Sequence, residues 1–335
     1  MLAISACGRE GRAGTPRTPV FADLNQVVTW ERTFRLEENQ SVINVSPWVT
    51  VLPSGEFLVS DGKEQQLRFY APDGRLRGTF GRRGSGPGEF QHLARAVRLN
   101  DGTILAADMM GEMTRFDSAG ARVLGTAHTS IGPLYELLVL NDSTVLIIGR
   151  KSGAVAGPLL HEWNLKGGRI MRSYFAAPQG PPGFAGSYAF TGFANADVRG
   201  DTVAVLFALE DTVRLFDRGR QIGKVAVPFR GFRKMETPLE PDPPPERFRA
   251  WWESYSTVTD LYWLRDGTFL VQYADQLRSD RRYSLLHMSR EGTPLWEASG
   301  SPNLLTLAAD ESLVFVKPGA EAPNEWSIAT LTAGR

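Results

Sequence analysis

The chain has 335 residues, enough for one large domain or two ordinary ones. Its 37 basic and 37 acidic residues balance, so its surface offers no general electrostatic attraction for nucleic acid or for an anionic membrane. No run approaches the ~20 apolar residues of a membrane-spanning helix, and 34 glycines with 21 prolines favour an all-β fold.

The first distinctive feature is Cys7, the single cysteine of the chain, in the sequence MLAISACGRE. An apolar residue and two small residues precede it, and this order resembles the lipobox of bacterial lipoproteins. The resemblance implies a diacylglyceryl thioether on the Cys7 sulfur and display at the bacterial cell envelope, on its periplasmic or outer-membrane face. We therefore expect residues 1–23 to be a lipid-anchored, flexible tether. A disordered tail with a free thiol is the alternative.

From residue 48 onward the chain repeats one unit, made of an apolar strand, a polar turn and a second apolar strand. Most of the turns carry the Asn, Asp and Gly residues of tight hairpins. A second hairpin with a turn glycine follows each copy, and in the last one the glycine is Gly334, which leaves no room for a fourth strand. The copies of the first hairpin begin at Trp48, Ala94, Leu134, Phe193, Asp260 and Leu304.

Two hairpins make a four-stranded antiparallel sheet, and six such sheets in sequence predict a six-bladed β-propeller. The sixth sheet lacks its outer strand. Residues 27–38, VVTWERTFRLEE, are a strand-like stretch without a neighbouring partner. We expect this N-terminal strand to complete the last blade, so that residues 24–335 form a single propeller domain.

A glycine-rich stretch, GRRGSGPGEF at residues 81–90, lies between the first two predicted blades. A phosphate-binding loop must open a helix, because the helix N-terminus supplies the N–H groups that hold the phosphate. A hairpin follows here instead, and Pro87 lacks a backbone N–H. The stretch is therefore predicted to cross from blade to blade and to bind no nucleotide.

The same stretch and the hairpins around it, over residues 55–120, resemble NHL-repeat propeller units, which share the Phe-Gly pair and the Gly-x-Gly-x-Gly-Glu-Phe crossing. The resemblance implies a six-bladed propeller of the bacterial envelope lipoprotein type, for which binding is more usual than a defined chemistry. It also implies a structural pair in a blade, between an acidic residue that ends the second strand and an arginine on the third. The matching pairs are Asp61 with Arg68, Asp108 with Arg115 and, more loosely, Asp211 with Arg214.

The residues that could carry chemistry are scattered. Zinc needs convergent ligands, but two of the four histidines, His161 and His287, fall on third strands that lie away from the channel. The starts of the inner strands show no recurring acidic residue, and no nucleophile elbow is present. The sequence therefore predicts no catalytic residue, metal or cofactor. A metal-assisted, gluconolactonase-like hydrolase or lyase, with its site dispersed over the channel mouth, is the alternative.

The largest departure from the repeat is the insertion at residues 228–256, between the fourth and fifth blades. Its prolines and Asp242 predict a helix over residues 246–255. Four aromatic rings fall on one face of this helix at helical spacing. We expect this face to seal one side of the propeller or to contribute to a binding site. The four residues are Phe248, Trp251, Trp252 and Tyr255.

The function predicted from the sequence is a non-catalytic, monomeric binding propeller that does not bind nucleic acid. We expect it to hold a protein, peptide or glycan through the loops of the channel mouth and the aromatic helix. A second insertion, residues 177–193, borders the same site or is a flexible crossing. A sensor domain whose channel ligand biases a partner is a further possibility. The candidate binding residues are Arg83, His92, Arg95, Arg150, Trp251, Trp252 and Tyr255.

Overall fold

The computed structural model describes residues 20–38, 47–154, 156–276 and 281–332. Cys7, Gly334 and most of the expected tether lie outside these ranges. Two residues of the segment assigned to the tether form a short strand, β1 (Val20–Phe21). No helix of the described part is long and apolar enough to cross a membrane.

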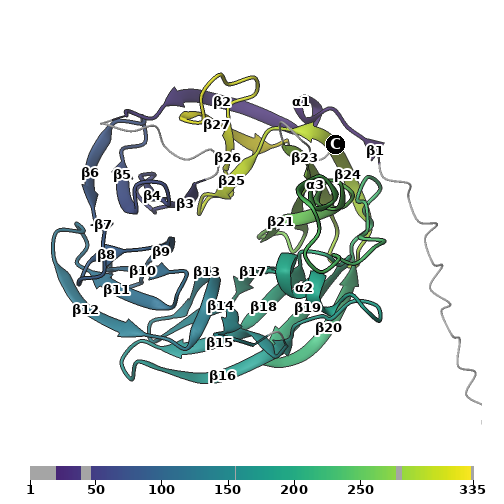
Figure 1. Ribbon diagram of the computed structural model, residues 1–335. Helices are drawn as coiled ribbons and strands as arrows, with labels where there is room; N and C mark the ends of the chain where they lie inside the picture. Colours follow the sequence, from purple (N-terminus) through teal and green to yellow (C-terminus); the bar gives the residue numbers. More distant parts are fainter. Residues whose placement is uncertain (1–19, 39–46, 155, 277–280, 333–335) are drawn as a thin grey trace, which may run out of the picture.

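Six antiparallel sheets are arranged in sequence order around a central channel, which confirms the predicted six-bladed propeller (Figure 1). Each blade has four strands, with the first strand facing the channel in blades 1 to 5. Blade 1 contains β3 (Trp48–Val51), β4 (Phe57–Asp61), β5 (Gln66–Tyr70) and β6 (Leu76–Phe80). Blade 2 contains β9 (Leu93–Arg98), β10 (Ile104–Asp108), β11 (Glu112–Phe116) and β12 (Val123–His128). Blade 3 contains β13 (Ile131–Asn141), β14 (Thr144–Lys151), β15 (Pro158–Asn164) and β16 (Arg169–Ala176).

The second half of the ring follows the same plan, and blade 6 takes its outer strand from the N-terminal part of the chain. Blade 4 contains β17 (Ala194–Arg199), β18 (Thr202–Phe207), β19 (Thr212–Asp217) and β20 (Arg220–Ala226). Blade 5 contains β21 (Ser256–Trp263), β22 (Phe269–Gln276), β23 (Arg281–Met288) and β24 (Pro294–Ser301). Blade 6 contains β25 (Leu304–Leu307), β26 (Leu313–Val316), β27 (Glu325–Leu331) and β2 (Val28–Arg35).

The ring is closed as predicted. Strand β2 pairs antiparallel with β27 along its whole length, from Val28 opposite Leu331 to Arg35 opposite Glu325. The short strand β1 pairs in parallel with β24 and adds a fifth strand to the outer edge of blade 5. The N-terminal segment therefore joins blades 5 and 6. Blade 6 in turn packs on blade 1, where Val49 and Phe57 share one core cluster with Val314 and Trp326.

Adjacent blades pack face to face, and this explains the apolar second strands. Strands β4 and β10 are buried at every position. Between them, Leu58 and Leu67 of blade 1 belong to one core cluster with Ile104 and Phe116 of blade 2. A strand covered on both faces cannot alternate apolar and polar residues as a half-exposed strand does.

The glycine-rich stretch is a crossing between blades, as predicted. Two short parallel strands, β7 (Arg82–Arg83) and β8 (Glu89–Phe90), cross from β6 toward β9. The Glu89 carboxylate accepts hydrogen bonds from the Gly86 backbone N–H at 2.9 Å and from Arg82 Nε at 2.7 Å. These bonds lower the pKa of Glu89. The backbone N–H of Gly86 in this loop thus binds the carboxylate of Glu89, a residue of the same loop.

The predicted bracing pair is confirmed in blade 1 and wrong in blades 2 and 4. Arg68 pairs with Asp61 at 2.5 Å, and both side chains are fully buried. In blade 2 the Asp108 carboxylate instead accepts backbone N–H groups, including that of His92 at 2.6 Å. The arginines expected to pair with Asp108 and Asp211 bind other carboxylates. Their partners are Asp101 for Arg115 and Glu210 for Arg214.

Within the described residues three short helices accompany the blades, where the sequence predicted one. The predicted helix is α3 (Pro245–Trp252), which ends three residues earlier than expected, and α1 (Leu24–Val27) precedes β2. The third, α2 (Ala185–Thr191), lies in the insertion at residues 177–193. The aromatic rings of α3 pack on α2 and on blades 3 and 4, in one cluster with Tyr188 and Phe207. Helix α3 thus covers part of the propeller, as the first of the two interpretations expected.

Candidate functional site

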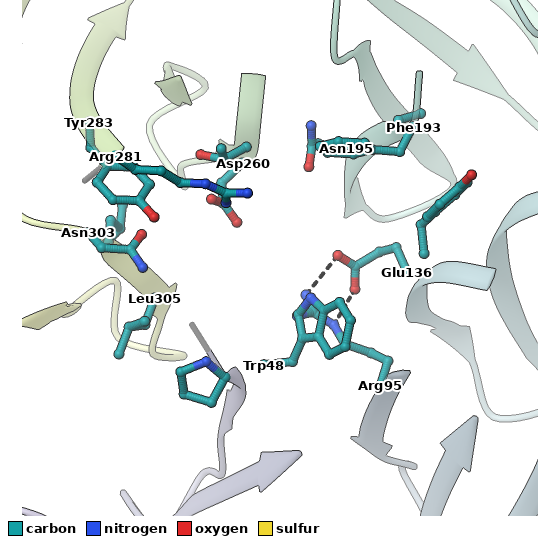
Figure 2. A pocket seen from close by; sticks show the side chains of 15 residues that line it. Trp48, Arg95, Glu136, Phe193, Asn195, Asp260, Arg281, Tyr283, Asn303 and Leu305 are labelled. Carbon is teal, nitrogen blue, oxygen red and sulfur yellow. Dashed lines mark hydrogen bonds and ion pairs between the residues drawn. The ribbon is translucent and has the colours of Figure 1, made fainter. Parts of the chain in front are cut away.

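The channel contains a cavity of about 260 Å³ at the end where the inner strands begin. All six blades contribute to it, and the side chains point into a common space (Figure 2). The lining residues are Pro47, Trp48, Arg95, Tyr135, Glu136, Phe193, Ala194, Asn195, Thr259, Asp260, Arg281, Tyr283, Asn303, Leu304 and Leu305.

A second cavity, of about 580 Å³, lies toward the other ends of the inner strands, where Val51 and Trp263 are found. Polar side chains line both cavities at once and so form the layer between them. These shared residues are Arg95, Glu136, Asn195 and Asp260. We call them the polar belt of the channel.

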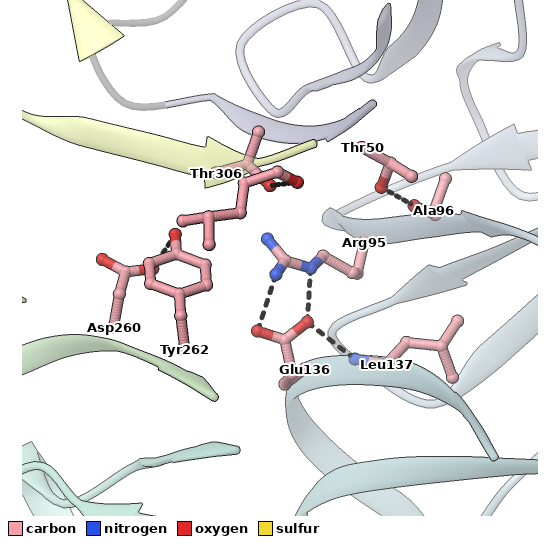
Figure 3. A network of polar contacts seen from close by, with 9 residues as sticks. Thr50, Arg95, Ala96, Glu136, Leu137, Asp260, Tyr262 and Thr306 are labelled. Atoms are coloured by element: carbon pink, nitrogen blue, oxygen red, sulfur yellow. Dashed lines mark hydrogen bonds and ion pairs between the residues drawn. The ribbon is translucent and has the colours of Figure 1, made fainter. Parts of the chain in front are cut away.

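An ion pair between two blades forms one half of the polar belt (Figure 3). Arg95 on β9 donates to Glu136 on β13 through two bonds, Nε to Oε1 at 2.5 Å and Nη2 to Oε2 at 2.7 Å. This bidentate geometry fixes both side chains and joins blade 2 to blade 3. Burial raises the pKa of Glu136, and the Arg95 charge opposes the rise.

Asp260 on β21 forms part of the opposite half. Its Oδ2 accepts a hydrogen bond from Nε2 of the fully buried Gln272 at 2.8 Å. The Gln272 Oε1 accepts the Leu304 N–H at 2.7 Å, which connects blade 5 to blade 6. Burial raises the pKa of Asp260 to about 7, and the bond from Gln272 opposes the rise.

The second cavity contains another shifted carboxyl group. Asp197 on β17 accepts the Trp263 N–H at 2.7 Å, which joins blade 4 to blade 5. Burial raises the pKa of Asp197 to about 6, and the bond from Trp263 opposes the rise. Carboxyl groups whose pKa is raised by burial thus lie in the polar belt itself, at Glu136 and Asp260, and in the second cavity, at Asp197.

Aromatic side chains form the mouth of the first cavity. Trp48, Tyr135 and Phe193 are half-buried and come from blades 1, 3 and 4. The rings of Tyr135 and Phe193 lie 6.0 Å apart at 42°. Tyr283 of blade 5 completes the set (Figure 2). Apolar rings around a few polar groups are the usual composition of a small-molecule site.

The Glu136 carboxylate is not available to a divalent cation in this arrangement. Both carboxylate oxygens of Glu136 accept bonds from the Arg95 guanidinium, whose positive charge would repel an ion placed there. In the described ranges, no three His, Cys, Asp or Glu side chains are grouped to share a metal. His161 and His287 lie on third strands, bonded to Ser173 and Thr268 at 2.8 Å each.

The seven candidate binding residues are not brought together. Arg95 lines the cavity, whereas Arg83 donates to the Lys63 carbonyl at 2.9 Å on the outside of the crossing. The exposed His92 precedes β9. Arg150 is buried and donates to the Gly192 carbonyl at 2.9 Å, at the C-terminal end of α2. The other three, Trp251, Trp252 and Tyr255, belong to the aromatic cluster of α2 and α3.

Sequence reasoning missed most of the cavity. The missed residues lie on three separate inner strands and follow no motif: Tyr135 and Glu136 on β13, Asn195 on β17 and Asp260 on β21. The inner strands FANADVRG and STVTDLYW contain polar residues, and these could have indicated the site. The inner strand of each blade is the one whose edge borders the channel. A polar side chain there is either bonded to a neighbouring blade or directed at a ligand.

Comparison with known proteins places the chain by its fold. No protein-family model and no curated protein matches it. The solved structure of a candidate exported protein from Bacteroides fragilis is similar, with a TM-score of 0.65, 11% identity, and coverage of 94% of this chain and 98% of that one. A DUF4221-family protein from Bacteroides vulgatus has a TM-score of 0.61 at 8% identity, covering 91% and 97% of the two chains. The shared property is the propeller fold.

Proposed function

We propose that the protein is a non-catalytic binding propeller whose ligand enters the first channel cavity. The ligand is a glycan, a peptide or a protruding part of a protein. One observation carries this proposal: all six blades contribute side chains to one cavity, and these side chains combine aromatic rings with a polar belt. Its four belt residues come from four different blades, so the ring holds them rigidly in place.

We further propose that the propeller is displayed at the bacterial envelope, through a lipid on Cys7. The lipobox-like sequence supports this, and so does the description of the similar Bacteroides fragilis protein as exported. The test is the mass of the N-terminal peptide, isolated from membranes of bacteria that express the full chain. Diacylglyceryl on Cys7 is the expected result. A Cys7→Ser variant should move to the soluble fraction, and a free thiol at Cys7 would refute the proposal.

The binding proposal is tested on panels of immobilised peptides and glycans. A Thr259→Trp variant places an indole ring in the cavity, since Thr259 is one of its lining residues. We expect it to lose at least tenfold in affinity for any ligand found. A Trp252→Ala variant changes the α3 cluster and should stay within twofold of the original protein. If Trp252→Ala loses affinity and Thr259→Trp does not, the binding site is at helix α3. Thermal melts of both variants verify folding.

The competing hypothesis is a metal-assisted hydrolase or lyase with its site at the channel mouth. Its support is that Glu136, Asn195, Asp260 and Asn303 all line one cavity. Its weakness is the Arg95 guanidinium bonded to Glu136. Calorimetric titration with calcium and zinc decides between the two. Stoichiometric binding that is lost in both Asp260→Asn and Glu136→Gln variants would favour the enzyme.

A further inference from the structure

Neutral sugars, ionic ligands and extended peptides make different demands on the cavity. A neutral sugar needs flat apolar surfaces for its C–H faces and groups that can both donate and accept hydrogen bonds for its hydroxyls. An anionic or cationic ligand needs an excess of opposite charge. An extended peptide needs a groove long enough for several residues.

The aromatic part of the mouth meets the first demand. Trp48 and Phe193 are labelled on different sides of the opening in Figure 2, and both rings border the open space. Because both side chains are half-buried, each keeps some surface exposed while its blade holds it in place. Rings held in this way offer contact area at a small cost in conformational entropy.

The polar part of the cavity meets the second demand. The Asn195 Nδ2 donates to the Val258 carbonyl at 3.2 Å, which orients the amide and gives its Oδ1 the role of acceptor. Asn303 adds a second amide from blade 6, with its Oδ1 accepting from Gln272 Nε2 at 3.2 Å. Arg281 contributes donors, and Asp260 contributes further oxygens, from the same side of the cavity (Figure 2).

The charges in the cavity nearly cancel. Arg95 and Glu136 neutralise each other through their two bonds. Arg281 and Asp260 are one further positive and one further acidic group among the lining residues. An ionic ligand would find little net attraction, whereas a neutral polyhydroxylated ligand needs none.

The size of the cavity argues against a peptide. Its volume of about 260 Å³ lies below the range of roughly 300–1,000 Å³ of drug-sized sites, and the polar belt forms its floor. This space suits one sugar ring, with the rest of a chain leaving through the mouth.

We propose that the first channel cavity is a carbohydrate site that takes the terminal residue of a neutral glycan. The aromatic mouth stacks on the sugar ring, and Asn195, Asn303 and the polar belt bond its hydroxyls. This inference rests on the proposed function, because it names the ligand class of the same cavity.

The test measures binding by calorimetry and by ligand-observed NMR. The probes are neutral methyl glycosides of glucose, galactose, mannose and N-acetylglucosamine, with glucuronic acid, glucosamine and a set of tetrapeptides for comparison. We expect at least one neutral glycoside to bind, and Trp48→Ala and Asn195→Ala each to weaken it at least tenfold. Trp296→Ala, on the outer strand β24, is the matched tryptophan control and should stay within twofold.

The outcomes separate the two proposals. In one outcome no neutral glycoside binds, but a charged probe or a tetrapeptide does, and Thr259→Trp abolishes that binding. This result overturns the carbohydrate inference and supports the proposal of a binding propeller. Neutral glycoside binding that Trp48→Ala and Asn195→Ala leave unchanged overturns the inference as well, since the sugar then binds elsewhere. If no probe binds in a way that Thr259→Trp abolishes, the channel is not the site, and both proposals are contradicted.

Discussion

Two arginine–carboxylate pairs with the same shortest N–O distance, 2.5 Å, occupy different places in the propeller. Arg68 and Asp61 lie within blade 1 at 2.5 Å, with side chains 1% and 0% exposed. Arg95 and Glu136 also lie 2.5 Å apart, but they join two blades at the channel and are 18% and 14% exposed. Both side chains of the first pair are therefore buried away from water. The second lines the first channel cavity, so under the proposed function it contributes to recognition as well as to stability.

The largest expected effect comes from breaking the pair in blade 1. Asp61→Ala leaves the Arg68 charge buried, and we expect a loss of ~3–5 kcal/mol in the free energy of unfolding. Chemical denaturation measures it. The double variant Asp61→Leu/Arg68→Met removes both charges and should be clearly more stable than the single variant. Equal stability of the two would show that the ion pair is not the cause.

Breaking the channel pair should cost less. Glu136→Gln removes the carboxylate that Arg95 binds, but water in the cavity can solvate the freed guanidinium. We expect a loss of about 2 kcal/mol, the usual value of a hydrogen bond to a charged group. Denaturation under the same conditions as for Asp61→Ala makes the comparison direct. If Glu136→Gln costs as much as Asp61→Ala, the channel is as dry as the interior of a blade.

The pH dependence of stability sharpens the description of the channel. Burial raises the pKa of Asp260 from 3.8 to about 7, so the folded protein binds a proton that the unfolded chain releases. The contribution of this group is fully present below pH 4 and is lost as the pH rises toward 7. A rise from 3.8 to about 7 corresponds to about 4 kcal/mol in a dry site. Because Asp260 is half-buried and lines a cavity, we expect the original protein to lose less than this, on the order of 1–2 kcal/mol relative to Asp260→Asn between pH 4 and pH 8. Parallel curves for the two proteins would contradict the raised pKa.

The smallest effect is expected for an exposed pair. Arg247 and Glu240 lie 3.0 Å apart in the insertion, with side chains 66% and 57% exposed. Exposed ion pairs contribute ~0–1 kcal/mol to the free energy of unfolding. We therefore expect the melting temperature of Arg247→Ala, measured by a thermal melt, to be almost that of the original protein. A large loss would mean that the insertion is coupled to the blades more tightly than its exposure indicates.

The blades were predictable because hairpins are local. Gly102 shows why: it takes a φ of +84°, which suits glycine, and its N–H donates to the Leu99 carbonyl at 2.9 Å. The closing strand was predictable as well, because the sixth predicted sheet lacked its outer strand and residues 27–38 formed a strand without a neighbouring partner.

Helix α2 was not predictable, because its segment APQGPPGFAGSYAFTGF is rich in the residues that normally break helices. Tertiary contacts stabilise it: the Tyr188 ring stacks on Phe207 of blade 4 at 5.8 Å. The channel site was not predictable for the same reason, because it too depends on tertiary contacts. Arg95 and Glu136 are 41 residues apart, and only the packing of blade 2 on blade 3 makes them neighbours.

The closure of the ring also has a consequence for synthesis on the ribosome. Thr33 of β2 lies beside Ser327 of β27, although 294 positions separate them in the chain. Strand β2 lies at the edge of its sheet, where it pairs with β27 alone. Because β2 is near the N-terminus, it leaves the ribosome long before β27 has been translated. During that interval β2 is an unpaired strand that could recruit other chains. We therefore expect a chaperone, or fast completion of translation, to help keep that strand available.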